Sequence, residues 1–175
     1  MSRIADAIIP EIENEGATAR RVLERVPEDK WDWKPHAKSM TIGQLANHVA
    51  TIPGNIAGWA AQDEFDFGSM QHGEDTTTRD ALLAAHDASV AKAKQFLEGL
   101  DDARAMGTWT GKMGDQVLMQ IPRAALVRNI MLNHWYHHRG QLSVYLRLLD
   151  IPVPSIYGPS ADENPFAARP ASAAS

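Results

Sequence analysis

The feature that most constrains this chain is a run of helical periodicity from about residue 122 to residue 149, which contains histidines. Steps of four and three residues define one stripe, made up of Val127, Met131, His134, His138, Gln141, Tyr145 and Leu148. Such spacing is typical of a helix face that packs against a core. We therefore expect a long helix with this stripe turned inward.

Two histidines one turn apart occupy the centre of the stripe, where a core normally holds Leu or Ile. Residues four apart on a helix have Cβ atoms roughly 6 Å apart, so His134 and His138 can bind one metal ion together. The alternative is a pair of hydrogen-bonded core histidines, in which each buried ring needs partners for both nitrogens. Both interpretations are open at this point.

Composition excludes several other classes of protein. The 175 residues suit one domain with a sizeable core, and 44% hydrophobic and 22% charged residues are ordinary for a globular protein. A net charge of −5 without a Lys/Arg cluster argues against a nucleic-acid partner. The lack of cysteine excludes disulfides, thiolate zinc sites and a cysteine nucleophile. No segment has the pattern of a secretory signal or membrane span, so we expect a cytoplasmic protein with no membrane partner.

Three further helices are expected before the histidine-bearing one, which spans residues 121–149. The first covers residues 4–26, although Pro10 is awkward inside it and suggests a start near that residue. The second covers residues 41–61 and opens on Thr41-x-x-Gln44, the spacing of a capping box. The third covers residues 77–100. Residues 61–77 are expected to connect helices, and residues 101–120 to form a short hairpin or a flap.

The second helix adds a third histidine to the candidate site. Its stripe contains His48 among Leu45, Ile52, Ile56 and Trp59, so His48 also takes a core-facing position. Three inward histidines on two facing helices indicate a site more strongly than one histidine does. Pro53 and Gly54 should kink this helix after His48 and free the carbonyl of Val49.

The remaining histidines are weaker candidates. His86 lies on the stripe of the third helix and competes for a metal role, but a hydrogen-bonded histidine is the preferred interpretation because no second ligand lies one turn away. His36 lies in the loop after Trp31 and Trp33, two indoles that we expect to dock on the helices. His137 points about 100° away from the stripe.

Several motifs resemble the DinB/YfiT-like family, and the resemblance covers most of the chain. They are Trp33-Lys34-Pro35, the segment from Ser39 to His48, the segment from His134 to Leu142 with Tyr145-Leu146-Arg147, and the segment from Pro152 to Ser160. The resemblance implies an all-α four-helix bundle in up-down-down-up order, usually dimeric, with a divalent metal ion held by three histidines. We expect one such domain over residues 1–163 and a disordered tail over residues 164–175.

Carried over residue by residue, the resemblance implies that the metal ligands are His48, His134 and His138. Three neutral imidazoles leave the ion its full charge and an open coordination position for a water or a substrate thiolate. Imidazole alone does not select the metal, and the resemblance suggests zinc or nickel. Family members that are thiol-dependent transferases imply a low-molecular-weight thiol as partner, which must be a separate molecule because the chain has no cysteine.

The spacing names further pocket candidates but no general base. Gln141, one turn beyond His138, is expected to orient a ligand or substrate or to hydrogen-bond within the stripe. Tyr145 and Trp59 are candidate pocket walls or plain core, and Arg139 lies off the stripe and should form a salt bridge. The leading hypothesis is a metal-dependent hydrolase or small-thiol transferase. The alternatives are a non-catalytic metal- or small-molecule-binding stress protein and a structural dimer.

Overall fold

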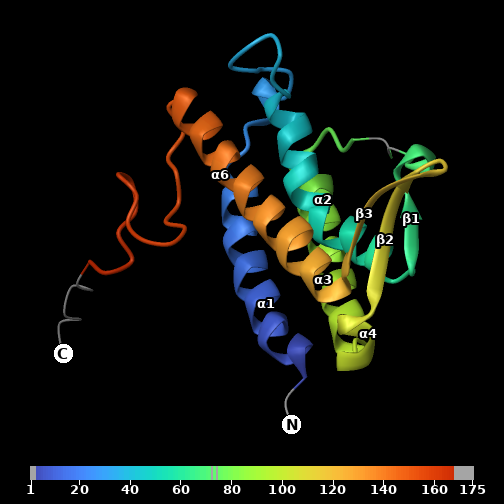
Figure 1. Cartoon of the computed structure of the whole chain (residues 1–175). Coiled ribbons are helices and arrows are strands. Elements are labelled where there is room, and N and C mark those ends of the chain that lie inside the picture. Colours follow the sequence, from blue (N-terminus) through green and yellow to red (C-terminus); the bar gives the residue numbers. More distant parts are fainter. Residues whose placement is uncertain (1–2, 72, 74, 168–175) are drawn as a thin grey trace, which may run out of the picture.

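The computed structural model describes residues 3–71, 73 and 75–167 and is mostly helical. Its long helices are α1 (Ile4–Leu23), α2 (Ile42–Ala60), α3 (Arg79–Glu98) and α6 (Asn133–Leu148) (Figure 1). The first three match the predicted ranges to within a few residues. The predicted fourth helix is divided into α5 (Arg123–Ala125), the π-helical segment η3 (Leu126–Leu132) and α6. Within these residues, no helix combines the length and apolarity needed to cross a lipid bilayer.

Local sequence signals explain where the helices begin. The Thr41 side chain accepts from the Gln44 amide at 3.1 Å, and the Gln44 side chain accepts from the Thr41 amide at 2.9 Å, so the predicted capping box is present. Thr78 caps α3 with a single hydrogen bond, because its hydroxyl accepts from the Ala81 amide at 3.3 Å. Helix α1 begins at Ile4, as the predicted range had it, and not at the alternative start near Pro10. An ion pair between Arg3 and Asp6 organises its first turn and leaves Pro10 inside the helix.

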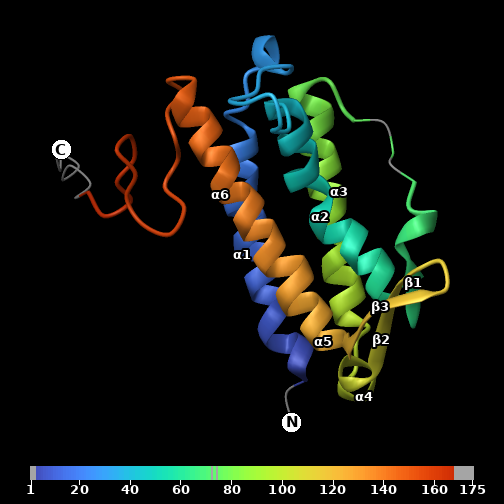
Figure 2. The same cartoon turned by 45° about the horizontal axis from the view of Figure 1, so that its top comes forward.

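The connection after α2 contains structure that the sequence did not indicate. Residues Glu64–Asp66 form the short strand β1, which pairs in parallel with β2 (Thr108–Met113). Strand β2 also pairs antiparallel with β3 (Gln116–Pro122), so the expected hairpin is present and β3 lies at the edge of the sheet (Figure 2). The short helix α4 (Asp102–Met106) precedes the hairpin. Two short 3₁₀ turns, η1 (Glu28–Lys30) and η2 (Phe67–Ser69), complete the fold.

Side chains attach two loops to α2 near His48: the loop that precedes α2 and the connection that precedes α3. Trp31 and Trp33 pack against the core as expected, and Trp31 lies so close to Gly43 that a Cβ there would approach its ring to 2.2 Å. The buried Asn47 side chain holds the connection before α3, because its Oδ1 accepts from the amide and hydroxyl of Thr76. These contacts rigidify the turn of α2 that carries His48.

The predicted inward stripe of the last helix is partly wrong. Val127 and Met131 are buried as expected, but beyond them the buried positions are Trp135, Arg139, Leu142 and Leu146. His134 and His138 are half-buried, and Gln141 and Leu148 are exposed. The π-helical segment η3 explains the change, since its wider turns rotate the following helix relative to a regular α-helix. The histidines therefore flank the core of α6, on the side that faces α2.

Pro53 has a specific structural effect, although α2 continues through it to Ala60. Proline has no amide hydrogen, so the carbonyl of Val49, four residues earlier, lacks its helical donor. The Trp135 indole Nε1 donates to this carbonyl at 2.9 Å. The carbonyl that the sequence predicted to be free thus binds α2 to α6 beside His48 and His134.

The segment after α6 is fixed to α1 and α6 by Arg139, which is 1% exposed. The Arg139 guanidinium forms an ion pair with Glu15 at 2.5 Å and donates to the Tyr157 hydroxyl at 2.6 Å. It also lies over the rings of Tyr136 and Tyr157, about 5 Å from each centroid. The expected salt bridge is present but buried. Residues 168–175 of the predicted tail lie outside the described residues.

Candidate metal centre

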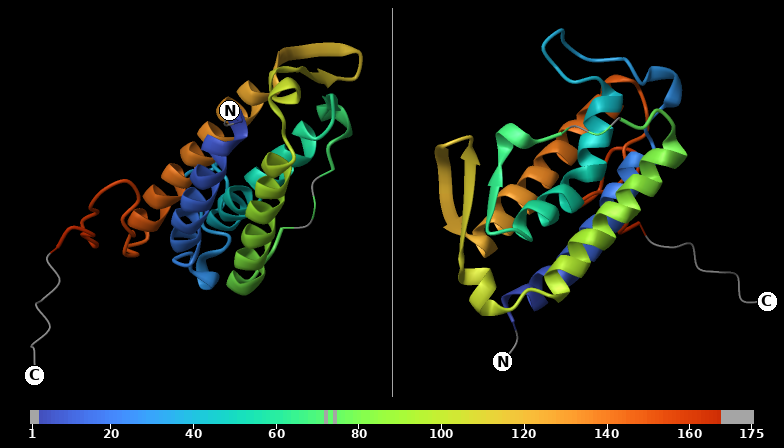
Figure 3. Two further views of the ribbon diagram at one scale, coloured as in Figure 1. Left: turned by 90° about the horizontal axis from the view of Figure 1, so that it is seen from below. Right: turned by 90° about the vertical axis from the view of Figure 1, so that its right-hand side faces the viewer.

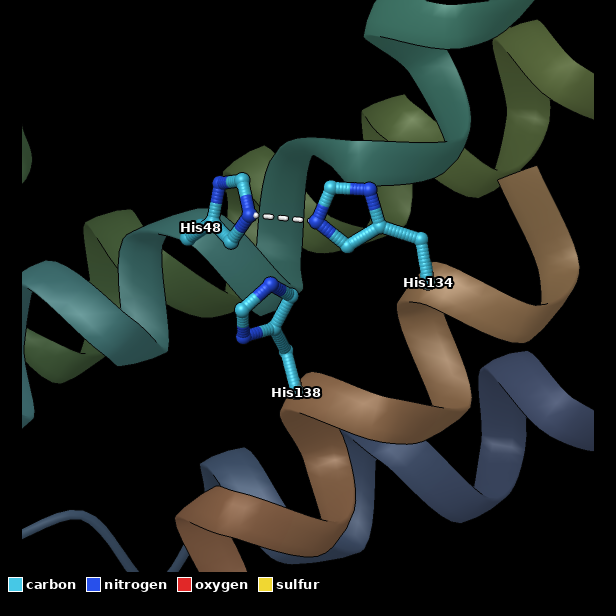
Figure 4. Close-up of side chains that lie close together, drawn as sticks. All are labelled: His48, His134 and His138. Atoms are coloured by element: carbon cyan, nitrogen blue, oxygen red, sulfur yellow. Dashed lines mark hydrogen bonds between the residues drawn. The ribbon is translucent and has the colours of Figure 1, made fainter. Parts of the chain in front are cut away.

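Three histidine side chains from two helices meet between α2 and α6. His48 comes from α2, and His134 and His138 come from successive turns of α6 (Figure 4). The Nε2 atoms of His48 and His134 are 3.0 Å apart, and the His138 ring centroid is 4.5 Å from each of the other two. One nitrogen from each ring can be chosen so that all three lie within 4.8 Å of one another. The structure therefore brings together the three residues that the sequence indicated.

The site keeps its imidazoles neutral. Burial, followed by the neighbouring His138 and His134, lowers the pKa of His48 to about 4. Burial is also the main reason why the pKa values of His134 and His138 are lowered, with a contribution from nearby histidines. A neutral imidazole has a free lone pair on one nitrogen, which is the form that binds a metal ion.

The geometry of the cluster is compatible with a bound divalent cation. Two nitrogens bound to one ion lie about 3–3.5 Å apart when each metal–nitrogen bond is about 2.1 Å long. The 3.0 Å separation of His48 and His134 is close to this value. Without an ion, a single proton lies between the two nitrogens and forms a hydrogen bond. A second proton would make both rings positively charged, and they would repel each other.

The surroundings of the three rings are made of amides and imidazoles. His138 Nδ1 is 2.7 Å from Gln141 Oε1, which makes Gln141 the hydrogen-bond partner that the sequence left undecided. Among the described residues, the hydrogen bonds and charges that act on the three rings come from histidines and Gln141, not from a carboxylate. In the part of the chain that the structure describes, the cluster thus has imidazole nitrogens but no general base beside them.

The two aromatic pocket candidates pack with other aromatic groups. Tyr145 meets Trp33 edge to face at 5.7 Å, and its hydroxyl donates to the Met40 carbonyl. Trp59 stacks on Phe65 at 4.9 Å and belongs to an aromatic cluster that continues into the sheet. Both contacts favour a packing role for these residues.

The other histidine candidates are separate from the metal centre. His86 is 1% exposed and donates through Nε2 to the Gly16 carbonyl at 3.0 Å, as the hydrogen-bonded interpretation predicted. Its Nδ1 has no partner within the described residues, and burial lowers its pKa. His36 is exposed in its loop, and His137 is exposed on α6. Neither belongs to the three-histidine group.

Comparison with known proteins agrees with the resemblance seen in the motifs. The model of the DinB family matches residues 1–167. Among relatives, the protein YrdA of Bacillus subtilis (strain 168) is 22% identical over 163 residues, which is 93% of each chain. The match therefore covers nearly the whole of both proteins.

Solved structures share the fold. A DinB-like protein from Bacillus subtilis superposes with a TM-score of 0.67 at 21% identity, over 83% of this chain and 96% of that one. A DinB-like protein from Bacillus cereus gives a TM-score of 0.69 at 16% identity, over 87% of this chain and 97% of the other. At these identities the likeness concerns the fold alone.

Proposed function

Because the chain belongs to the DinB family, we propose that its three-histidine cluster binds one divalent metal ion, zinc or nickel, and that the protein is a metal-dependent enzyme. One observation carries the proposal: His48, His134 and His138 present neutral imidazoles to a common point. Regular core histidines would each need separate partners, whereas one cation can use all three lone pairs.

Among the described residues no carboxylate acts on the cluster, which favours a thiol-dependent transferase over a hydrolase. A bound ion would supply Lewis-acid chemistry at the coordination positions that the histidines leave free. A protein group that accepts a proton from the attacking water also assists hydrolysis, and none is present among the described groups that act on the rings. A thiol, with a pKa near 8.5, can ionise without such a group. We therefore infer a low-molecular-weight thiol as co-substrate, because the chain has no cysteine.

The metal assignment is tested by elemental analysis of the purified protein and two variants. His134→Ala removes a proposed ligand and should abolish stoichiometric binding of zinc and nickel. His137→Ala changes a neighbouring exposed histidine on the same helix and should leave the stoichiometry unchanged. Retention of one metal ion per chain by His134→Ala would refute the ligand assignment.

The enzymatic part needs a separate assay. Metal-loaded protein is incubated with small thiols and electrophilic acceptors, and in parallel with ester and amide substrates. We expect thioether formation that the His134→Ala variant loses and the His137→Ala variant keeps. Stoichiometric metal binding without turnover in either assay would favour the alternative, a non-catalytic metal- or small-molecule-binding stress protein.

The arrangement of helices follows from the same family membership. We propose an up-down-down-up four-helix bundle formed by α1, α2, α3 and the helix from residue 123 to Leu148, as one domain over residues 1–163. The long connection at residues 61–78 supports this order, because adjacent helices that point the same way need a link along the bundle (Figure 3). Helix α3 packs against both α1 and α2, as neighbours in such a bundle do.

We also propose that the protein is a homodimer, and the hairpin offers a surface for it. Strand β3 is an edge strand without charged residues, and Val117 and Leu118 are about half exposed on it. Sedimentation at micromolar concentration should give a dimer, and Leu118→Lys should shift it toward monomer. A monomeric wild-type protein would refute the proposal.

A further inference from the structure

The hydrogen bond between His138 and Gln141 determines which nitrogen of His138 is free. Gln141 Oε1 can only accept, so the His138 Nδ1 atom 2.7 Å away carries the proton. The neutral ring then has its lone pair on Nε2. Figure 4 shows this nitrogen directed toward His48 and His134, while Nδ1 points away from them.

We propose that Gln141 is a positioning residue, which fixes the tautomer and rotation of the His138 ring and so makes Nε2 its ligand atom. The inference rests on the proposed metal-binding function and adds a role for a residue outside the ligand set. The hydrogen bond at one ring nitrogen generally decides which nitrogen binds a metal.

His138 needs this help more than the other two rings do. His48 and His134 orient each other, because one Nε2 donates to the other at 3.0 Å. That shared proton also means that one of these two atoms has no lone pair, and that the lone pair of the other accepts the hydrogen bond until an ion enters. His138 is half exposed, and with water as its only partner either nitrogen could hold the proton. Gln141 therefore gives the site one lone pair that is ready before the ion arrives.

The position of Gln141 makes the proposal testable without damage to the fold. The side chain is exposed, three residues beyond His138 on the surface of α6. Gln141→Leu removes the acceptor at nearly the same size, and Gln141→Glu keeps an oxygen acceptor and adds charge. Gln116→Leu makes the same chemical change at an exposed position of β3 and serves as the matched control.

The first measurement uses metal-free protein with chelator at pH 8, where nitrogen-15 NMR of the histidine rings reports the tautomers. We expect His138 to be protonated on Nδ1 in wild type, Gln141→Glu and Gln116→Leu, and to be a mixture of tautomers in Gln141→Leu. The second measurement is zinc affinity by competition with a chromogenic chelator. Gln141→Leu should weaken zinc binding about 10–100-fold, Gln141→Glu should bind at least as tightly as wild type, and Gln116→Leu should be unchanged.

The two measurements separate this proposal from the proposed function. If wild type binds no zinc and elemental analysis finds no nickel either, the metal function fails, and the NMR spectra still decide whether Gln141 sets the tautomer. If wild type binds zinc but Gln141→Leu has the wild-type tautomer and affinity, the positioning role is overturned while the metal function remains. An equal loss of affinity in Gln116→Leu would also overturn it, because the effect would then be unspecific.

Discussion

The hydrogen bond from Trp135 to Val49 allows a direct test of how the fold positions the histidines. The Trp135 indole is fully buried and donates at 2.9 Å to a carbonyl that lacks its helical donor because of Pro53. Trp135→Phe keeps an aromatic ring but leaves this buried carbonyl without a partner. An unsatisfied buried acceptor costs about 1–3 kcal/mol, so we expect that loss in the free energy of unfolding, in addition to the loss of packing.

Pro53→Ala provides the second arm of a double-mutant cycle. Alanine at position 53 supplies an amide hydrogen that can bond the Val49 carbonyl within α2, so Trp135→Phe no longer leaves it unsatisfied. In that background the cost of Trp135→Phe should fall by about 1–2 kcal/mol. Urea unfolding gives the free energy of unfolding of wild type, the two single variants and the double variant. If their m-values are equal, the shifts in midpoint report changes in stability.

A second tryptophan provides the control for this cycle. The buried Trp109 donates through Nε1 to the Trp59 carbonyl at 3.0 Å, outside the reach of Pro53. Trp109→Phe should therefore cost the same in the wild-type and Pro53→Ala backgrounds. If Trp135→Phe also costs the same in both, the indole does not compensate for the missing proline donor, and the reasoning is refuted.

Three further predictions concern pH, metal and the buried arginine. With chelator present, the free energy of unfolding should fall as pH drops from about 6.5 toward about 4. The folded-state pKa values of His48 and the other buried histidines are lowered, so the unfolded chain binds more protons than the folded chain in that window. A melting temperature that does not change with pH would contradict this. Zinc at a hundredfold its Kd should add about 2.7 kcal/mol to the free energy of unfolding at pH 7.5, which raises the melting temperature by about 5–10 °C. Calorimetry should no longer detect this rise in His134→Ala or near pH 4. Arg139→Met should lower the free energy of unfolding, measured with urea, by about 3–5 kcal/mol, because it leaves the Glu15 carboxylate without its cation. Adding Glu15→Gln to this variant should recover part of the loss. If the costs of the two substitutions are additive, the residues are not a coupled pair.

Periodicity and capping signals were sufficient to predict the long helices. The Thr41–Gln44 box starts α2 one residue from the predicted position, and α1 begins at the predicted residue, Ile4. Residues 101–120 were expected to form a hairpin or a flap, and the structure has the hairpin. Its turn contains Gly114, whose φ of +56° suits glycine. Strand β1 could not be predicted, because it has only three residues and pairs with a strand far away in the sequence, so it leaves no local pattern.

The three histidines were correctly predicted to lie together, but for a partly wrong reason. Their spacing was interpreted as an inward stripe, whereas α6 buries Trp135, Arg139 and Leu142 instead. A π-helical segment depends on tertiary packing and leaves no periodic signal in the sequence, so the rotation that it causes could not be foreseen. Arg139 was missed as a buried residue for the same reason, and because a charged side chain is rarely buried without a partner.

Two departures from regular helical bonding together explain why the histidines lie at the edge of the core. The π-helical segment rotates α6 so that Trp135 points into the core and His134 points toward α2. The proline in α2 leaves free the carbonyl that Trp135 binds, which fixes the two helices at the level of His48. A fully inward position would bury any ion among apolar side chains with no free side. The observed position leaves all three rings half-buried, which suits the proposed metal ion because a substrate-binding metal needs an open coordination position.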